Sequence, residues 1–374
     1  MNNQTVSFGN VTKQVIDIKA VQESQTLGWQ INKYKFPEIW SQTQGEGVKV
    51  AVVDTAVDLR HPDIDIKGGR DFVNNRTINY YKKAYPVEGH GTHVSGIISA
   101  RDNDAGMVGV APLCEVYNCS VLDDYGSGTY EDIIKAIDWC IKNEMDVINM
   151  SLGGGGDFKE FYDAIRRAYD ANIPIVCAAG NSSWDTGYLD FPATYNETIA
   201  VASINKNMNR SSFSSIGSNI DVAAPGSNIL SCTPKNNYEV YSGTSMAAPF
   251  VTGLIALMIA KHRATGGNTP VNTVEEIRQH IIKTTTDVDN IGQDNYTGYG
   301  LINPANAIGY ETEENQADYI NFKQLTDGSL KVMFDNNIRF KPNRKRKMKK
   351  TITAGVHNVQ FRPRVVKKSV ITKL

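Results

Sequence analysis

Three residues that together could cleave an acyl bond stand far apart in the chain: Asp54, His90 and Ser245. Asp54 ends the apolar run at 48–54, His90 opens the stretch HGTHVSG, and Ser245 directly precedes an apolar segment typical of a helix. A nucleophilic serine needs a base for its proton, and a histidine base needs a carboxylate that fixes its tautomer and stabilises its cation. The set therefore indicates acyl transfer by an activated serine.

Two simpler interpretations compete with this one. A lone serine at a helix start is usually an N-cap, and two histidines three residues apart, His90 and His93, suggest a metal site. However, H-x-x-H lacks the spacing of the H-E-x-x-H zinc helix, and the sequence offers no third ligand. Because Asp54, His90 and Ser245 each lie at an expected strand end or helix start, we favour catalysis and expect His93 to be structural. Asn181 adds a side-chain N–H donor for an oxyanion.

The elements that must position these residues are strands alternating with helices. Apolar residues form helical stripes within 129–144 and again within 157–172. The expected strands are apolar on both faces, which is typical of a parallel sheet covered by helices on both sides. They span 48–54, 116–122, 146–152, 173–179, 198–204 and 220–226. We therefore predict a doubly wound, mostly parallel, three-layer α/β fold with its chemistry at the carboxyl ends of the strands.

Six short segments resemble the subtilisin (subtilase) family of serine proteases. In the family's order they are VAVVDTAVD (50–58), GHGTHVSG (89–96), NMSLGG (149–154), AAGN (178–181), DVAAPG (221–226) and SGTSMAAP (242–249). The likeness runs from about residue 25 to residue 308, roughly three quarters of the chain. One such motif would be weak, whereas six in the same order are specific.

The resemblance implies a serine endopeptidase and a role for each matched residue. Asp54 would orient His90, the general base, and Ser245 would attack the peptide carbonyl. Asn181 and the backbone N–H of Ser245 would form the oxyanion hole. A polypeptide substrate would lie as an added strand between two backbone segments. The matching segments are Gly126-Ser127-Gly128 and Ser151-Leu152-Gly153.

The resemblance also places a residue at the base of the pocket for the substrate side chain before the cleaved bond, the P1 residue. In the family, the residue before an aromatic-Pro pair lines that pocket and is often small or neutral. Here the pair is Phe191-Pro192 and the preceding residue is Asp190. A carboxylate there would favour Lys or Arg through a charge-assisted contact. The alternative is that Asp190 points into solvent.

A calcium site is a further implication of the resemblance. Hard oxygen ligands suit Ca²⁺, and the loop RDNDAGM (101–107) has the family's length. The alternative is a turn of Asp, Asn and Gly without metal. The matched ligands are the side chains of Gln25, Asp63 and Asn103 and the backbone carbonyls of Arg101, Ala105 and Met107.

Charge is unevenly distributed along the chain. Residues 338–374 hold 13 of the 39 Lys and Arg residues and no acidic residue, which leaves the rest of the chain with 26 basic against 40 acidic groups. The basic tail could bind nucleic acid or another anionic surface, or it could be a solvated arm. The expected organisation is an N-terminal extension (1–24), a peptidase domain (25–310), a linker (311–337) and this tail.

The ends and the cysteines suggest the cytoplasm. The start of the chain does not have the pattern of a secretory signal, and no uninterrupted apolar run is long enough to span a membrane. Five cysteines without a C-x-x-C pair are typical of reduced, buried thiols. We therefore expect a cytoplasmic protein, with export by a route without a signal peptide left open.

The short extension resembles that of intracellular subtilisins, which are usually dimers and whose extensions inhibit. The apolar-Pro-Tyr element of that inhibition is absent from residues 1–24, so the sequence does not predict inhibition here. Two functions remain from the sequence. One is an active endopeptidase. The other is a regulated zymogen or protease-like scaffold whose basic tail binds nucleic acid or an anionic partner.

Overall fold

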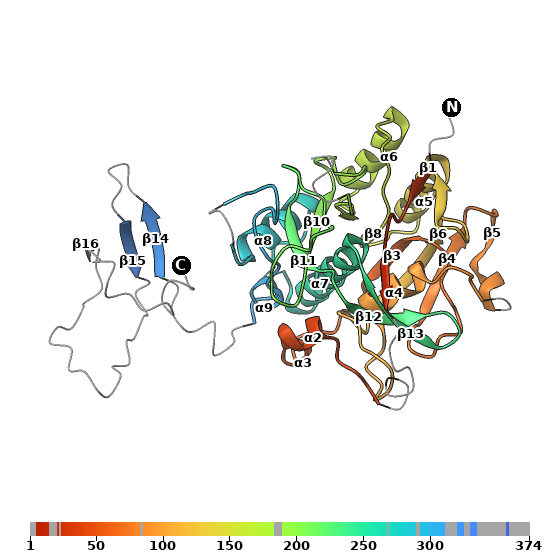
Figure 1. Ribbon diagram of the computed structural model, residues 1–374, viewed down its shortest axis with the longest axis horizontal. Helices are drawn as coiled ribbons and strands as arrows, with labels where there is room; N and C mark the ends of the chain where they lie inside the picture. The colour runs from red at the N-terminus through yellow and green to blue at the C-terminus, as the bar shows by residue number, and fades with distance from the viewer. Residues whose placement is uncertain are drawn as a thin grey trace. The chain divides into compact units, whose positions relative to one another are not determined.

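The computed structural model describes residues 5–14, 21, 24–82, 85–182, 189–267, 269–288 and 292–310, together with three short strands beyond residue 310. Contacts within the chain divide it into two units, residues 1–310 and 311–374. Figure 1 shows the elements of both, and each unit is described by itself.

An eight-stranded sheet forms the centre of the first unit (Figure 1). All neighbouring strands are parallel except for the antiparallel edge pair β4–β5. The order across the sheet is β11 (Val222–Pro225), β10 (Ile199–Ile204), β9 (Ile175–Ala178), β8 (Val147–Met150), β3 (Lys49–Asp54), β6 (Glu115–Ser120), β4 (Ile66–Asp71) and β5 (Arg76–Thr77). The predicted α/β fold with a mostly parallel sheet is confirmed, and each of the six expected strands lies in it.

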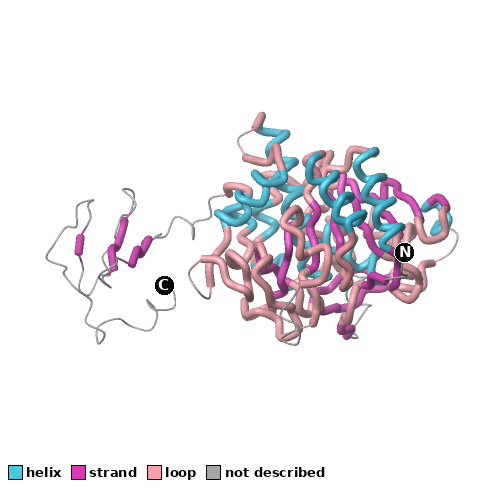
Figure 2. Tube along the Cα trace, turned by 90° about the horizontal axis from the view of Figure 1, so that it is seen from above, coloured by secondary structure: helices cyan, strands magenta, loops and turns pink. Residues whose placement is uncertain are grey.

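Helices cover both faces of the sheet, as the doubly apolar strands predicted. Along β3, Val50 and Val52 pack in one buried cluster, whereas Ala51 and Val53 pack in another. The first cluster includes residues of α4 (His90–Ser99) and α7 (Thr244–Thr265), and the second includes residues of α5 (Tyr130–Lys142) and α6 (Lys159–Asp170). Figure 2 shows the strands of this unit with helices packed along them.

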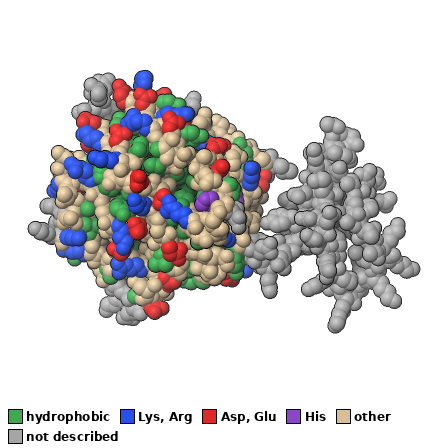
Figure 3. Space-filling model, turned by 180° about the vertical axis from the view of Figure 1, so that it is seen from behind, with side chains coloured by type: hydrophobic (Ala, Val, Ile, Leu, Met, Phe, Trp, Pro, Cys, Tyr) green, Lys and Arg blue, Asp and Glu red, His purple; other side chains and the backbone are tan. Residues whose placement is uncertain are grey.

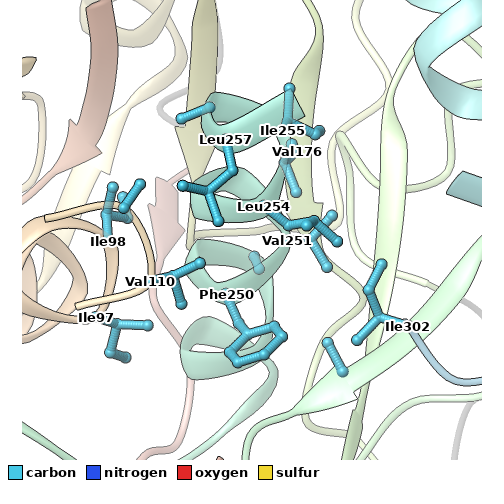
Figure 4. Packing of buried hydrophobic residues seen from close by; sticks show 14 of the residues in the cluster. Ile97, Ile98, Val110, Val176, Phe250, Val251, Leu254, Ile255, Leu257 and Ile302 are labelled. Atoms are coloured by element: carbon cyan, nitrogen blue, oxygen red, sulfur yellow. The ribbon is translucent and has the colours of Figure 1, made fainter. Parts of the chain in front are cut away.

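The core on the α4 and α7 side is closely packed (Figure 4). Ile97 and Ile98 of α4 lie on one side of α7, and Phe250 and Leu254 project from α7 itself. Among the described residues, α7 is the helix long and apolar enough to span a membrane, but 94% of its most apolar window is buried inside the protein. Its length and apolar character are therefore also those of a buried core helix.

Smaller elements complete the first unit. They are β1 (Thr5–Ser7), β2 (Thr12–Gln14), α2 (Trp29–Lys33), α3 (Phe36–Ile39), the 3₁₀ helix η1 (Ile78–Lys82), β7 (Ser127–Thr129), β12 (Ile229–Thr233), β13 (Asn237–Ser242), α8 (Val274–Thr284) and α9 (Pro304–Ala307). β1 pairs with β7, and β2 joins β13 and β12 in a three-stranded antiparallel sheet. Residues near the N-terminus are therefore part of the folded unit.

The second unit holds three described strands, β14 (Ile320–Gln324), β15 (Leu330–Phe334) and β16 (His357–Asn358), in one antiparallel sheet. The sequence did not predict strands in the segments expected to be a linker and a basic tail. Most of residues 338–374 lie outside the described residues.

On the face of the first unit seen in Figure 3, acidic and basic side chains are interspersed.

Candidate active site

A buried hydrogen bond joins the end of β3 to the start of α4. Asp54 is the last residue of β3 and His90 is the first residue of α4, and both are buried. The His90 Nδ1 atom lies 2.7 Å from Asp54 Oδ1, and the Thr55 backbone N–H donates to the same oxygen at 2.7 Å. Since an ionised carboxylate only accepts, this contact places the proton on Nδ1 and leaves Nε2 as the basic nitrogen.

The glycine after the histidine allows this close approach. A Cβ atom on Gly91 would overlap the backbone carbonyl of Thr55, so a larger residue would push α4 away from β3. The Gly91 N–H also donates to Thr55 Oγ1 at 2.8 Å. The sequence G-H-G therefore fixes the position of the imidazole against the strand end.

Ser245 lies at the start of α7, one residue inside the helix, and is buried. Its single hydroxyl proton has two backbone carbonyls within hydrogen-bond distance, that of Ser151 at 3.2 Å and that of Phe8 at 3.3 Å. The Ser151 hydroxyl in turn donates to the Ser245 carbonyl at 2.8 Å. α7 is thereby tied to the segment after β8, and its first turn points the serine at the carboxyl ends of the strands.

The expected hydrogen bond between Ser245 and His90 is not formed. Among the described residues, His90 Nε2 is buried and has no hydrogen-bond partner. The Phe8 ring stacks on the imidazole, with centroids 4.2 Å apart and planes 11° from parallel, and the Phe8 carbonyl lies 3.3 Å from the Ser245 hydroxyl. The structure therefore joins Asp54 to His90 but inserts residue 8 at the nucleophile.

Asn181 presents its amide N–H to the same cleft, and Thr244 sets that orientation. The Thr244 backbone N–H and hydroxyl both donate to Asn181 Oδ1, at 2.9 and 3.0 Å. With its oxygen held by Thr244, the amide points Nδ2 toward the chain in the cleft, where it donates to the Asn10 carbonyl at 3.2 Å. The sequence indicated Asn181 but not Thr244, although the place of Thr244 directly before Ser245 was an available signal.

The two backbone segments expected to hold a substrate do hold a strand, and that strand is the chain's own N-terminal segment. β1 pairs antiparallel with β7, matching Val6 with Gly128 and Ser7 with Ser127. On its other side, Ser7 exchanges both backbone hydrogen bonds with Gly153, at 3.0 and 2.7 Å. The segments 126–128 and 151–153 thus lie on either side of residues 5–7, as the added-strand arrangement requires.

This finding corrects one inference from the sequence. The missing apolar-Pro-Tyr element gave no reason to expect residues 1–24 in the cleft, yet residues 5–14 run through it and past it. Beyond the nucleophile, Thr12–Gln14 pairs with Val240–Ser242 of β13. The short motif was the wrong signal, because backbone pairing on both sides needs no particular side chain.

Gly9 interrupts the strand at the nucleophile. Its φ of 68° lies in the left-handed region, which residues other than glycine rarely adopt. The carbonyl before it, of Phe8, meets Ser245, whereas the carbonyl after it, of Asn10, meets Asn181. Attack requires one carbonyl to meet the nucleophile and the oxyanion donor together. In this conformation these two contacts go to different carbonyls.

Asp190 lies against the glycines that border the nucleophile. A Cβ atom added at Gly153 or at Gly180 would lie 2.6 Å from the Asp190 side chain, so both glycines leave room for it. A cavity of about 10 Å³, lined by Ser245 and Asp190 among others, lies here. Burial raises the pKa of the Asp190 carboxyl above its ordinary value. Among the described residues, no Lys or Arg forms an ion pair with it.

The residues matched to a calcium site are only partly arranged as ligands. Asp63 is buried and accepts from Asn103 Nδ2 at 3.0 Å and from the Met107 N–H at 2.8 Å, and burial raises its pKa. The Gln25 side chain accepts from the Asp104 N–H at 3.2 Å. Arg101 and Ala105 lie in the same loop, and the Arg101 side chain pairs with Asp65. Within the described residues no three acidic, His or Cys side chains gather as a metal site.

His93 has a structural environment, as predicted. It is fully buried, its ring stacks on Tyr241 at 4.1 Å, and its Nε2 lies 3.1 Å from the Ile229 carbonyl. Burial, with a smaller effect from His90, lowers its pKa to about 3. His93 therefore stays neutral at physiological pH and ties α4 to the β12–β13 pair.

Comparison with known proteins gives the same relationship as the motifs. Residues 45–300 match the subtilase family. The chain is 42% identical over 283 residues to subtilisin NAT of Bacillus subtilis subsp. natto, covering 75% of this chain and 71% of that protein. It is 42% identical to a subtilisin of Bacillus pumilus, over 75% of this chain and 98% of that protein. An intracellular serine protease of Paenibacillus polymyxa is 39% identical over 279 residues, 73% of this chain and 84% of that protein.

The depressed pKa of His93 predicts a loss of stability in acid. Between the ordinary His value of 6.5 and a folded value of about 3, the unfolded chain binds a proton that the folded chain does not. Stability from this group is therefore complete above pH 6.5 and falls as the pH drops, by about 1.4 kcal/mol per pH unit at most. We expect His93→Asn to be less stable than wild type at pH 7.5 but to lose less further stability between pH 6.5 and 4. Denaturant unfolding across this range measures both, and parallel curves would contradict the assignment.

Proposed function

The chain belongs to the subtilase family and is a subtilisin-like serine endopeptidase, and on that premise we propose that Asp54, His90 and Ser245 carry its chemistry in a chain that holds itself closed. The observation behind both halves of the proposal is the Asp54–His90 hydrogen bond with residue 8 inserted before the serine. Asp54 and His90 are already hydrogen-bonded to each other, and the chain's own N-terminal segment lies where a substrate would bind.

Once that segment leaves, the reaction follows from the positions of the donors. Ser245 Oγ attacks the peptide carbonyl carbon, and its proton passes to His90 Nε2, while Asp54 stabilises the imidazolium. Asn181 Nδ2 and the Ser245 N–H donate to the oxyanion. Collapse breaks the C–N bond as His90 gives its proton to the departing amine. Water then attacks the acyl-enzyme by the same route and releases the acid.

The self-inhibition is supported by the split between the two contacts at Gly9. Ser245 meets the Phe8 carbonyl and Asn181 meets the Asn10 carbonyl, so no carbonyl carbon is both attacked and stabilised. The Phe8 ring also covers the His90 imidazole. Residues 5–14 therefore bind as a peptide without being cut, and the zymogen form of the alternative function is the one we favour.

A basic P1 preference is supported by the place of Asp190 beside Gly153 and Gly180. A Lys or Arg side chain entering from the adjacent cleft would meet a carboxylate that no cation pairs among the described residues. Charge-assisted contacts of this kind are stronger than neutral ones. Polypeptides with Lys or Arg before the cleaved bond are thus the proposed substrates.

A calcium ion at the 101–107 loop is supported by a buried carboxylate. Asp63 would hold it together with oxygens of Gln25 and Asn103 and the carbonyls of Arg101, Ala105 and Met107. The bound ion would stabilise the folded loop against the unfolded chain. For Asn103 this requires the amide to present its oxygen, in place of Nδ2, to the site.

A cytoplasmic location is supported by the five cysteines, all free and buried, because disulfides are rare in that compartment. One relative is named an intracellular serine protease, whereas another is named a minor extracellular protease. We propose the cytoplasm on the cysteines and on the first of these relatives.

The closed state predicts that Gly9→Ala opens the enzyme. An L-residue pays about 1–2 kcal/mol in the left-handed conformation, which destabilises the bound strand at Ser245. We expect a fluorophosphonate probe to label Ser245 at least about fivefold faster than in wild type, since about 1 kcal/mol corresponds to that factor. Intact-mass spectrometry over time measures the rate.

The matched control is Gly47→Ala. Gly47 has a φ of 69°, and a Cβ atom there would have nothing within 4 Å. This exchange should leave the labelling rate unchanged. Labelling must disappear in Gly9→Ala/Ser245→Ala, and a label retained there would show that Ser245 is not the nucleophile. Equal rates in wild type and Gly9→Ala would reject the role of Gly9.

Asp190 predicts a pH-dependent preference for Arg over Gln at P1. The carboxylate attracts Arg only when ionised, so in the Gly9→Ala chain the ratio of kcat/KM for Arg and Gln peptides should rise with pH through a pKa above 3.8. In Asp190→Asn we expect this ratio to fall about tenfold and to stay flat with pH. Protonation of His90 affects hydrolysis of both peptides equally, so it cancels in the ratio of their kcat/KM values. An unchanged ratio in Asp190→Asn would reject the pocket.

The calcium proposal predicts a thermal shift that depends on Asp63. Calcium at about 100 times its Kd should stabilise wild type by about 2.7 kcal/mol, raising Tm relative to protein in EDTA. Asp63→Asn should lose this response. Asp65→Asn is the matched control, because Asp65 is half-exposed and pairs with Lys67 and Arg101. A response that is equal in all three proteins, or absent in wild type, would reject the site.

A further inference from the structure

The bound N-terminal segment follows the path of a substrate as far as Phe8. Ser7 exchanges both backbone hydrogen bonds with Gly153, and Val6 pairs with Gly128, so the strand is regular up to this point. The left-handed conformation begins only at Gly9. The Phe8 ring lies against His90 and Gly126, whereas Asp190, in the proposed P1 pocket, lies against Gly153 and Gly180. Gly9 therefore takes the P1 position, and the side chain of residue 8 reports what the cleft accepts directly before it.

The Phe8 ring lies in a space with two defined walls. One wall is the His90 imidazole, parallel to the ring at a centroid distance of 4.2 Å. The other is the backbone of Gly126, where a Cβ atom would overlap Cε1 of the ring. The ring also packs against the buried cluster on the α5 side of the sheet. The space exists because residue 126 has no side chain.

Gly126 is held in place by its turn. Its φ is 76°, its N–H donates to the Asp123 carbonyl at 3.0 Å, and the Asp123 side chain accepts from the Ser127 N–H at 2.9 Å. This wall is thus a fixed turn, and it presents a bare backbone to whatever side chain stacks on His90. A flat aromatic ring fills such a slot, whereas Ala would leave the imidazole face open to water.

We propose that this enzyme selects peptides with an aromatic residue directly before the P1 residue, and that Gly126 determines this specificity. The inference rests on the proposed function and adds a second side chain to the substrate. Together with Asp190, it defines the substrate class as peptides of the form aromatic–basic before the cleaved bond. Stacking on the imidazole also removes water from the proton path between Ser245 and His90.

Peptide hydrolysis by the full-length Phe8→Ala chain tests this inference. In that chain the segment can no longer stack on His90. We compare two peptides that differ only in Phe or Ala before a P1 Arg. We expect kcat/KM to be at least about tenfold higher for the Phe peptide. In Phe8→Ala/Gly126→Ala the ratio should fall toward one, because the added Cβ atom occupies the space that the Phe side chain needs.

Gly266→Ala in the Phe8→Ala chain is the matched control. Gly266 has a φ of 73° and nothing within 4 Å of a Cβ atom, so it bears the same backbone strain away from the cleft. It should keep the tenfold ratio. Equal hydrolysis of the two peptides in the Phe8→Ala chain would overturn the inference while leaving the endopeptidase intact. Absence of both hydrolysis and Ser245 labelling would reject the proposed function, and the inference with it.

A second measurement does not depend on the folding of Gly126→Ala. In the otherwise unchanged chain, the fluorophosphonate labelling rate of Ser245 reports how tightly residue 8 is held. We expect Phe8→Tyr to label as slowly as wild type, and Phe8→Leu and Phe8→Ala to label about tenfold faster or more. If Leu holds the segment as well as Phe does, the slot is not selective for a ring and the inference fails.

Discussion

The hydrogen bond between Asp54 and His90 is the constraint around which the first unit is arranged. It requires a strand end and a helix start, 36 residues apart in the chain, to meet within 2.7 Å in a buried place. β3 lies between β8 and β6 in the sheet, and α4 packs on the face that it shares with α7. Gly91 permits the approach, and Thr55 donates its N–H to Asp54 Oδ1 and accepts from the Gly91 N–H. Asp54 Oδ1 accepts two hydrogen bonds, which offset part of the cost of burying the carboxylate, whereas Oδ2 is buried without a partner among the described residues.

The cleft extends from this bond because the neighbouring strands end at the same edge. Ser151 follows β8, Asn181 comes three residues after the end of β9, and Ser245 lies in the first turn of α7. Each backbone segment there has groups free to pair with an extended chain. Such an edge can pair with the backbone of an extended peptide of any sequence, so selectivity must come from the side-chain contacts.

The N-terminal segment binds in the cleft through its backbone and through its side chains. Its backbone pairs with β7, Gly153 and β13, which gives binding without demanding a sequence. Its side chains are more specific, since Phe8 stacks on His90 and Lys13 lies 3.2 Å from Glu88. At Gly9, which has a φ of 68°, the strand turns away from a regular extended path. The same contacts therefore support both proposals, that the segment inhibits the enzyme and that the cleft selects an aromatic side chain.

The sequence by itself indicated the central sheet, the helices that cover it and the candidate residues Asp54, His90, Ser245 and Asn181. These features follow from short stretches of sequence, because a buried strand or helix needs a local apolar pattern and each motif spans only a few residues. It did not reveal β4, because IKGGRD has little apolar character and lies near the sheet edge. It also did not reveal the segment in the cleft. Backbone pairing between residues more than a hundred positions apart leaves no side-chain signature, so only the tertiary structure placed residues 5–14 beside His90 and Ser245, with Gly9 in the left-handed conformation.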